Sequence, residues 1–258
     1  MEKQSRLIYQ VAVGEVPPFY GICIESVARY CNRYHIDHIV QTEPVLKIAP
    51  LKSARSENAL RLGYLPILEK SVAFSYLDRY DQIAIIDADV FIMDSAPDIF
   101  DELQAATFAG VLERDMPLTP AYFSKIAKHS EGQFRSLTDV DWRWNEHGAE
   151  FYNMGLMVFS RDLLEYLRGE TPEQFIRRPE FERFVNGEGY WKWSTDQTLL
   201  NWWVKKTGMA TRNLSWKWNA LYGAVQAVTE AYFVHFFLSA KLKPGEIERA
   251  IESLRHND

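Results

Sequence analysis

The chain has 258 residues, of which 47% are hydrophobic and 25% are charged. This balance is typical of a globular protein, and the length suits one large domain with a sizeable core. The formal net charge of −6 lacks the basic excess of nucleic-acid binding, and no apolar run approaches the roughly 20 residues that cross a bilayer. We therefore expect no nucleic-acid partner and no transmembrane segment.

The two cysteines, Cys23 and Cys31, fall in one expected helix. Eight residues along a helix span about 12 Å, roughly twice the Cα separation that a disulfide tolerates. Free thiols are therefore expected, which fits a reducing cytoplasm. Residues Met1–Arg6 lead directly into an apolar strand without the plan of a signal peptide, so we expect a cytoplasmic protein. No pattern indicates an oligomeric state.

Strands and helices alternate through residues 1–112. The expected elements are a strand at Leu7–Val13, a helix at Phe19–Arg33, a strand at His38–Thr42, a helical region from Ser56 or Asn58 to about Tyr80 that is broken near Pro66, a strand at Ile83–Ile92, a helix capped by Ser95 and a strand at Thr107–Leu112. This alternation predicts an α/β fold with a mainly parallel sheet and right-handed crossovers.

The second half, residues 113–258, begins with an irregular segment, Glu113–Glu150, which we interpret as a lid or binding loop. The later expected elements are a strand at Phe151–Ser160, helices at Arg161–Arg168 and after Pro172, a helix at Asp196–Lys206 between Thr195 and Gly208, a strand at Tyr232–Leu238 and a helix from Pro244. No repeat or linker interrupts the pattern, so residues 1–258 are expected to form a single domain.

Two aspartates interrupt the apolar run Ile83–Ile92, with Ala88 between them. A continuous apolar run is typical of a buried parallel strand, and α/β proteins bind ligands at the carboxyl ends of such strands. Side chains two residues apart on an extended backbone point the same way, so Asp87 and Asp89 are expected to converge. Two carboxylates suit a divalent cation, and the cation suits a diphosphate. The alternative is that both acids are solvated where the strand leaves the core.

Asn153 and Gly155 interrupt the apolar strand Phe151–Ser160. Glycine in a strand often marks close approach by a ligand or another backbone, and a β-bulge is the alternative. Asp196 and Gln197 open a helix, where the helix dipole also favours a carboxylate for purely structural reasons.

His235 lies inside an apolar strand, where most histidines are hydrogen-bonded core residues. A neutral imidazole beside two carboxylates would instead make a site better suited to Mn²⁺ than to Ca²⁺ or Mg²⁺. Lys241 and Lys243 follow within reach of a phosphate bound at such a metal.

All eight tryptophans lie beyond residue 140 and fall into close pairs. The pairs are Trp142 with Trp144, Trp191 with Trp193, Trp202 with Trp203, and Trp216 with Trp218. Indoles stacked on one face suit a carbohydrate groove, because sugars pack their C–H faces on aromatic rings. Core packing is the alternative for any single tryptophan.

Taken in order, these motifs resemble those of GT-A glycosyltransferases, above all family eight, the glycogenin and lipopolysaccharide galactosyltransferase group. That group typically reads D-x-D after an apolar strand, then F-N-x-G, D-Q-D-x-L-N, W-N and H-F-x-G-x-x-K-P. The matching segments are Asp87–Asp89, Tyr152–Gly155, Asp196–Gln197 with Leu200–Asn201, Trp218–Asn219 and His235–Phe236. The resemblance spans Leu7 to about Pro244 and implies a GT-A, Rossmann-like fold.

The resemblance implies an enzyme, a metal-dependent hexosyltransferase that moves a sugar from a nucleotide donor, expected to be UDP-linked, to a hydroxyl acceptor with retention. Its nucleotide-binding half would be about 1–112 and its acceptor side about 113–258. Asp87, Asp89 and His235 would hold Mn²⁺ or Mg²⁺, and Asp196 and Gln197 would lie beside the anomeric carbon. At the nucleoside, the implied donor contacts are Ala12, Val13, Gly14 and Tyr20, and at the sugar they are Asn153 and Gly155. Lys241 or Lys243 would contact the phosphates. Lys70, and Ala88 with its flanking acids, are further implied donor contacts.

The chain departs from the group's pattern at Thr198, where a second aspartate is usual, and at Leu238 and Leu242, where glycine and proline are usual. These departures leave open a carbohydrate- or nucleotide-binding module without turnover. A haloacid-dehalogenase-like phosphohydrolase, with Asp87 as nucleophile, is a further alternative. That family usually has threonine two residues after its second aspartate, where this chain has Phe91.

Overall fold

The computed structural model describes residues 4–50, 57–193, 195–237, 243 and 245–257. Its large sheet has the strand order β2-β1-β3-β6-β5-β7. The strands are β1 (Arg6–Val11), β2 (Asp37–Gln41), β3 (Gln82–Ile86), β5 (Phe108–Leu112), β6 (Tyr152–Ser160) and β7 (Thr211–Asn213). Within this sheet only β6 runs antiparallel to its neighbours, so the sheet is mainly parallel, as predicted.

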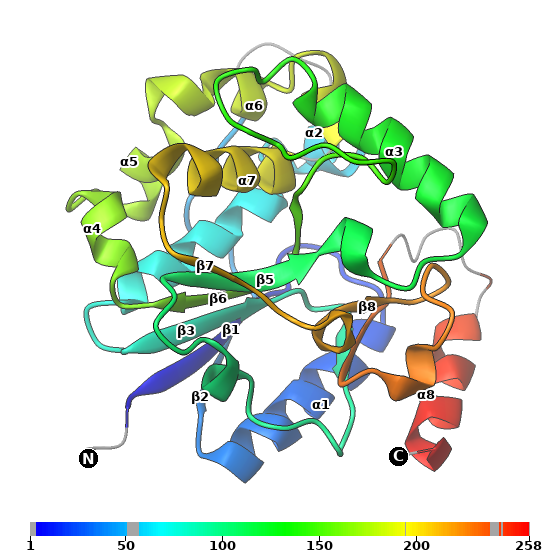
Figure 1. Cartoon of the computed structure of the whole chain (residues 1–258). Helices are drawn as coiled ribbons and strands as arrows, with labels where there is room; N and C mark the ends of the chain where they lie inside the picture. The colour runs from blue at the N-terminus through cyan, green and yellow to red at the C-terminus, as the bar shows by residue number, and fades with distance from the viewer. Residues whose placement is uncertain (1–3, 51–56, 194, 238–242, 244, 258) are drawn as a thin grey trace.

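Helices cover both faces of the large sheet (Figure 1). Helices α1 (Phe19–Tyr34) and α8 (Glu246–Asn257) lie below it in this view, and α3 (Pro120–Phe134), α5 (Pro172–Ile176) and α7 (Thr195–Thr207) lie above it. The remaining helices are α2 (Glu57–Leu62), α4 (Leu163–Leu167), α6 (Glu182–Asn186) and the 3₁₀ helices η1 (Pro66–Tyr76), η2 (Ile99–Glu102), η3 (Glu113–Asp115), η4 (Pro179–Phe181), η5 (Gly189–Trp193), η6 (Trp216–Trp218) and η7 (Val228–Glu230). Because both faces are covered, every residue of β3 is buried.

A smaller sheet has the order β4-β9-β8, from β4 (Val90–Ile92), β9 (Phe233–His235) and β8 (Ala220–Leu221). The predicted strand Ile83–Ile92 is therefore divided between two sheets. A turn joins the two parts, in which the N–H of Val90 donates to the carbonyl oxygen of Asp87 at 3.1 Å. The expected extended backbone from Asp87 to Asp89 is wrong, because the chain must change direction to pass from one sheet to the other.

The segment Glu113–Glu150, which we expected to be irregular, contains the helix α3. Pro120 stands at the start of this helix, where its fixed φ and missing N–H are tolerated. The buried residues of α3 are Ile126, Ser130, Gln133 and Phe134. Two of the four are polar, which conceals the apolar periodicity of the helix.

Asp98, rather than Ser95, caps the element after β4. Its side chain accepts a hydrogen bond from the N–H of Phe100 at 3.1 Å, at the start of η2. At the end of the chain, α8 begins at Glu246. The expected cap Ser56, the expected strand end Leu238 and the expected helix start Pro244 lie outside the described residues.

Two other expectations concern the cysteines and the membrane. Cys23 and Cys31 are buried free thiols, as predicted. Within the part of the chain that the structure describes, none of the helices has the length and apolar character that a membrane crossing requires.

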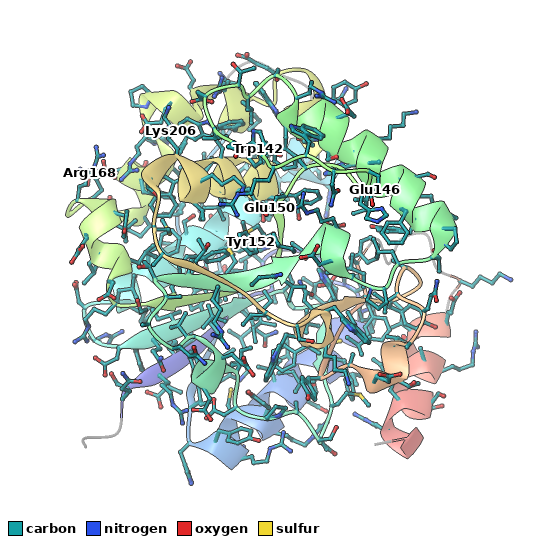
Figure 2. The ribbon with its side chains drawn as sticks, in the orientation of Figure 1. Trp142, Glu146, Glu150, Tyr152, Arg168 and Lys206 are labelled. Carbon is teal, nitrogen blue, oxygen red and sulfur yellow. The ribbon has the colours of Figure 1, made fainter. Side chains whose placement is uncertain are left out.

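The tryptophans whose side chains the structure describes, which are all except Trp193, serve mainly as core residues rather than as an open carbohydrate groove. Trp142, Trp202, Trp203 and Trp218 are all buried. Figure 2 shows Trp142 at the level of α3 and α7, and its ring packs against Phe134 of α3 with 4.4 Å between the ring centroids. Trp144, Trp191 and Trp216 are partly buried against the same core.

Candidate functional site

Polar side chains gather at the edge of the large sheet where its parallel strands end. Asp87 directly follows β3, and Glu113 directly follows β5. Because β6 is antiparallel to both strands, its first residues lie at this same edge, and Leu112 pairs with Tyr152. Asn153 therefore reaches the edge from the opposite chain direction.

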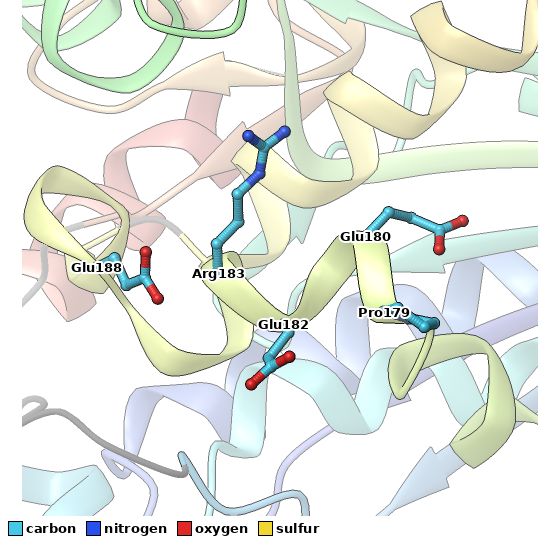
Figure 3. A pocket seen from close by; sticks show the side chains of 5 residues that line it. All are labelled: Pro179, Glu180, Glu182, Arg183 and Glu188. Carbon is cyan, nitrogen blue, oxygen red and sulfur yellow. The ribbon is translucent and has the colours of Figure 1, made fainter.

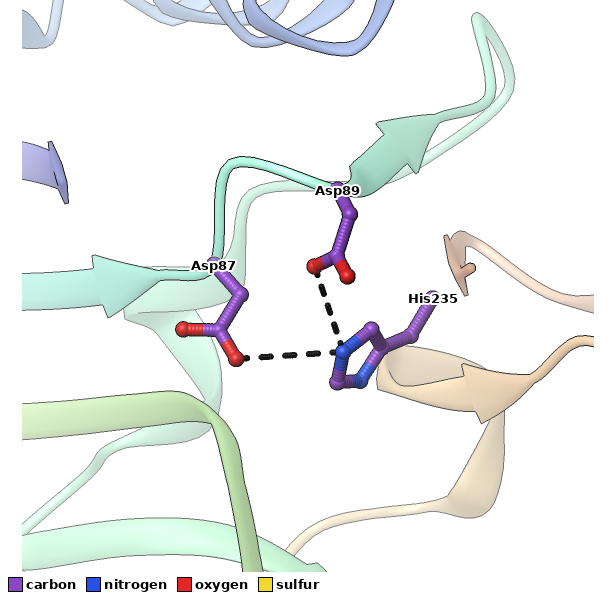
Figure 4. A group of neighbouring side chains, drawn as sticks. All are labelled: Asp87, Asp89 and His235. Atoms are coloured by element: carbon purple, nitrogen blue, oxygen red, sulfur yellow. Dashed lines mark ion pairs between the residues drawn. The ribbon is translucent and has the colours of Figure 1, made fainter. Parts of the chain in front are cut away.

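His235 is brought to the two aspartates by the small sheet. It pairs with Val90 across β4 and β9, and the N–H of Phe236 donates to the carbonyl oxygen of Asp89 at 3.0 Å. The imidazole Nε2 lies 3.3 Å from Oδ1 of Asp89 and 3.8 Å from Oδ2 of Asp87 (Figure 4). One ligand atom from each of the three residues lies within 4.8 Å of the others. Two carboxylates and an imidazole at this spacing fit a divalent cation such as Mn²⁺ or Mg²⁺.

A hydrogen-bond chain orients the imidazole for a metal. Nδ1 of His235 lies 3.1 Å from Oδ1 of Asn219, whose own Nδ2 donates to Oδ1 of Asn153 at 2.9 Å. Because Oδ1 of Asn219 can only accept, Nδ1 carries a proton, which leaves Nε2 as the nitrogen that can bind a metal beside the aspartates. Such outer partners typically fix the tautomer of a metal-binding histidine.

The protonation equilibria of the three candidate ligands are perturbed. Burial raises the pKa of Asp87, although the neighbouring Lys70 ammonium opposes the shift. Burial also acts to raise the pKa of Asp89, but the imidazole of His235 brings it below its ordinary value. Burial acts to lower the pKa of His235, and the charge of Asp89 more than offsets this, so the pKa is raised. The triad thus attracts positive charge, which a cation would supply.

Lys70, on η1, joins the metal candidates to the predicted catalytic acid. Its Nζ lies 2.5 Å from Oδ1 of Asp87 and 3.1 Å from Oδ2 of Asp196, and it donates to the carbonyl oxygen of Met154 at 3.2 Å. Both Lys70 and Asp196 are buried. Burial acts to lower the pKa of Lys70, but the two carboxylates raise it well above its usual range, so the side chain is a permanent cation.

Gln197 and Asn201 tie α7 to the first residues of β6. Oε1 of Gln197 accepts from the N–H of Met154 at 3.4 Å, and Asn201 exchanges hydrogen bonds with the backbone of Tyr152 at 2.7 and 2.8 Å. These contacts hold the amino end of α7, with Asp196, against the site edge. Thr198 is directed elsewhere, because its hydroxyl donates to Gln133 on α3 at 2.7 Å.

Glu113 and Tyr122 belong to the site region but were missed by the sequence analysis. Glu113 is buried and accepts hydrogen bonds from Asn153, Gln197 and Tyr122. Burial raises its pKa to about 7 despite these donors. Nothing in the sequence distinguishes Glu113 from the other acids of its segment except its place immediately after a strand.

Gly155 is required by the close approach of His235. A Cβ atom at position 155 would lie 2.3 Å from Cε1 of His235, closer than such atoms ever come. The strand pairing is also irregular here, because the register between β5 and β6 shifts between Ala109 and Val111. The irregular register fits the β-bulge interpretation of the glycine, and the close approach observed in the structure is made by the side chain of His235.

The segment expected to line a nucleoside pocket follows β1, in which Nε2 of Gln10 donates to the carbonyl oxygen of Asp87 at 3.2 Å. The N–H of Ala12 donates to the carbonyl oxygen of Gln41 at 2.8 Å. Val13 is buried, and Gly14 is exposed with a φ of 84°, which favours glycine. Burial raises the pKa of Tyr20 strongly, and the charges of Asp89 and Asp87 raise it further, which places this phenol near the acids.

Of the two lysines expected at the phosphates, Lys241 lies outside the described residues. Lys243 is exposed, and its backbone N–H donates to Glu246 at 3.0 Å. No described contact connects Lys243 with the aspartates or with His235.

A separate hollow of about 460 Å³ lies beside α6, lined by Pro179, Glu180, Glu182, Arg183 and Glu188 (Figure 3). None of these residues belongs to the site edge. Three of the five are glutamates, whose charge repels a diphosphate. We therefore place the candidate site at the aspartates rather than in this hollow.

No protein-family model matches the chain, and the search of curated proteins gave no match. Among solved structures, the chain is similar to the galactosyltransferase LgtC in complex with donor and acceptor sugar analogs, with 12% identity, a TM-score of 0.50 and coverage of 97% of this chain and 94% of that one. It is also similar to mouse xyloside xylosyltransferase 1 in its apo form, with 13% identity, a TM-score of 0.50 and coverage of 93% and 100%. The chain thus has the GT-A fold of these glycosyltransferases, which confirms the predicted fold.

Proposed function

We propose that this protein is a metal-dependent glycosyltransferase that moves a hexose from a UDP-sugar to a hydroxyl acceptor with retention of configuration. The observation that carries the proposal is the convergence of Asp87, Asp89 and His235 at the carboxyl edge of a mainly parallel sheet. Nucleotides bind at such edges in α/β proteins. The fold shared with LgtC and the xylosyltransferase supports the same reaction class.

The triad supports a role in binding the donor diphosphate. Asp87, Asp89 and His235 would hold Mn²⁺ or Mg²⁺, which would supply Lewis-acid stabilisation to the departing diphosphate. Lys70 adds a fixed positive charge beside Asp87. Ala12, Val13, Gly14 and Tyr20 would contact the nucleoside, Ala88 would lie with the acids beside the phosphates, and Lys241 or Lys243 would complete the phosphate contacts.

Asp196 and Gln197 are proposed to act at the anomeric carbon, with Asn153 and Gly155 on the sugar side. In glycosyl transfer, positive charge develops at that carbon, and a positioned carboxylate or amide oxygen stabilises it. Asp196 is held by Lys70, and Gln197 is held by Met154 and Glu113, so both oxygens are fixed before a donor arrives. Fixed dipoles stabilise developing charge without reorganising during the reaction.

A binding module without turnover is the second candidate, and Thr198 is the observation that favours it. The family-eight group usually has an acid at this place, whereas Thr198 is buried and hydrogen-bonded to Gln133.

A phosphohydrolase finds less support. Its nucleophile would be Asp87, but each carboxylate oxygen of Asp87 already has a neighbour of opposite charge when the imidazole is protonated. Oδ1 contacts Lys70 at 2.5 Å, and Oδ2 faces His235 at 3.8 Å.

Isothermal titration with UDP, with and without Mn²⁺, tests the proposal. We expect binding that needs Mn²⁺ in the native chain and in the control Asp101→Asn, an exposed acid away from the triad. Asp89→Asn should lose the binding. An absence of Mn²⁺-dependent binding, or native binding in Asp89→Asn, contradicts the proposal.

Turnover is tested with UDP-hexoses and a panel of sugar acceptors. Release of UDP together with a glycosylated product supports a transferase, and NMR of the product's anomeric proton reports retention. Tight UDP binding with only slow donor hydrolysis across the panel favours the binding module instead.

A further inference from the structure

Glu69 is a fully buried carboxylate, and within the described part of the chain its hydrogen-bond donors are all amides. It accepts from the backbone N–H groups of Val45 and Lys47 at 2.8 Å, from that of Leu46 at 3.1 Å and from Nε2 of Gln41 at 2.8 Å. None of these four donors carries a charge. Burying a carboxylate costs free energy unless hydrogen bonds satisfy its oxygens. The hydrogen bonds to Glu69 meet this condition, so its burial is a structural feature of the fold.

The loop around Glu69 is shaped to receive it. Three successive N–H groups that point to one centre form a concave anion site, and such sites need a residue in the left-handed region. Lys47 has a φ of 50°, which a non-glycine residue adopts only when the surroundings hold it there. Gln41, the last residue of β2, also accepts a hydrogen bond from the hydroxyl of Tyr9 on β1. Glu69 thus fixes η1 to the carboxyl ends of two parallel strands.

The next residue, Lys70, leaves the same helix in another direction. In a 3₁₀ helix, successive side chains are about 120° apart, so neighbours reach different surroundings. Glu69 faces the 45–47 loop, whereas Lys70 contacts Asp87 at 2.5 Å and Asp196 at 3.1 Å. Glu69, which binds the 45–47 loop, and Lys70, which binds the site acids, are therefore adjacent residues of one buried segment, Leu68–Phe74. A displacement of η1 at Glu69 is passed directly to Lys70.

We propose that Glu69 is a positioning residue, which acts through Lys70 to keep its ammonium between Asp87 and Asp196. The inference rests on the proposed function, since it assumes that these acids serve a nucleotide-sugar site. Glu69 itself touches neither donor nor metal. Its carboxylate sets the position of η1 against the 45–47 loop and thereby the position of Nζ of Lys70.

A crystal structure of the ligand-free variant Glu69→Gln tests the geometry directly. The glutamine NH₂ group cannot accept from backbone N–H groups, so the 45–47 loop and η1 should separate. We expect Nζ of Lys70 to leave Asp87 or Asp196. If Lys70 keeps both ion pairs, the inference is overturned, whatever the nucleotide does. Should Glu69→Gln fail to fold, Glu69→Asp, which withdraws the carboxylate by one methylene, is measured in the same way.

A double-mutant cycle on UDP binding with Mn²⁺ separates positioning from general damage. Glu69→Gln and Lys70→Met should each weaken binding about 10-fold or more, as loss of an outer partner typically does. In the Lys70→Met background, Glu69→Gln should weaken it no further. The control Tyr30→Phe, which removes a buried hydroxyl bonded to Pro97 and Ile99 at 2.7 Å, should leave UDP binding unchanged.

The outcomes distinguish the two proposals. Equal losses from Glu69→Gln in both backgrounds would mean that Glu69 acts independently of Lys70, and the inference fails while the proposed function stands. A native chain that does not bind UDP with Mn²⁺ would remove the proposed function, and the crystal structure alone then decides whether Glu69 positions Lys70.

Discussion

The ring of His235 occupies the space that a side chain at position 155 would need, because a Cβ atom there would lie 2.3 Å from Cε1 and 2.5 Å from Nδ1 of the imidazole. The glycine of one strand and the histidine of another are therefore a matched pair. Gly155→Ala should push the ring away from the aspartates and lower Mn²⁺ affinity about 10–100-fold. Titration of Mn²⁺ followed by electron paramagnetic resonance measures this.

Gly21→Ala is the matched control for that substitution. Gly21 lies in α1, and a Cβ atom there meets nothing within 4 Å. Its Mn²⁺ affinity should equal that of the native chain. Native affinity in Gly155→Ala would show that the ring adjusts without cost and would contradict the predicted pairing.

Asn219→Leu should weaken metal binding without touching a metal ligand. The substitution removes the acceptor of the Nδ1 proton of His235, which lies 3.1 Å away. The imidazole then loses its fixed tautomer, and we expect Mn²⁺ affinity to fall about 10–100-fold. Mn²⁺ titration measures the effect, and thermal unfolding without metal reports the accompanying loss of stability. Unchanged affinity would mean that strand pairing alone orients the ring.

Lys70→Met should destabilise the fold, because it leaves the partly buried carboxylate of Asp87 and the buried carboxylate of Asp196 without their shared cation. Removing one partner of a buried ion pair typically costs about 3–5 kcal/mol. Urea denaturation of the metal-free protein at neutral pH measures the change. Lys206→Met is the control, since its pair with Asp139 at 3.1 Å is solvent-exposed and should contribute less than about 1 kcal/mol. Equal effects of the two substitutions would contradict the prediction.

The buried carboxyl of Glu113 predicts a pH dependence of stability. Its pKa is raised by burial from 4.5 to about 7, so the folded state holds a proton that the unfolded chain releases. The contribution of Glu113 to stability should therefore fall by on the order of 3 kcal/mol as pH rises from about 4.5 to about 7. Urea denaturation across this range should show a slope in the native chain that is smaller by this amount in Glu113→Gln. A native slope in Glu113→Gln would assign the effect to other groups.

Local patterns were sufficient to predict the mainly parallel sheet and most of its strands. The apolar run before Asp87 predicts a buried strand because both faces of β3 are covered. The helix α3 was not predicted because Ser130 and Gln133 lie on its buried face. Polar residues there break the 3.6-residue apolar period on which a helix prediction depends.

The convergence of Asp87 and Asp89 was predicted from their spacing, whereas the assignment of His235 to the same site came from the family resemblance. His235 meets Asp89 only through the pairing of β4 with β9, which joins segments far apart in the chain. Local periodicity carries no information on such pairing. Glu113 was missed for a similar reason, because its hydrogen-bond partners Asn153, Gln197 and Tyr122 come from three other segments.

The turn after β3 connects the two sheets, so an ion bound at this turn would also link distant parts of the chain. Asp87 and Asp89 stand on this turn, His235 stands on the last strand, and Arg255 of α8 lies 5.6 Å above the ring of Phe91 in β4. An ion coordinated by the three side chains would connect the C-terminal strand β9 to the turn after β3. Chelation should therefore make the C-terminal strand and helix the first part of the molecule that a protease releases.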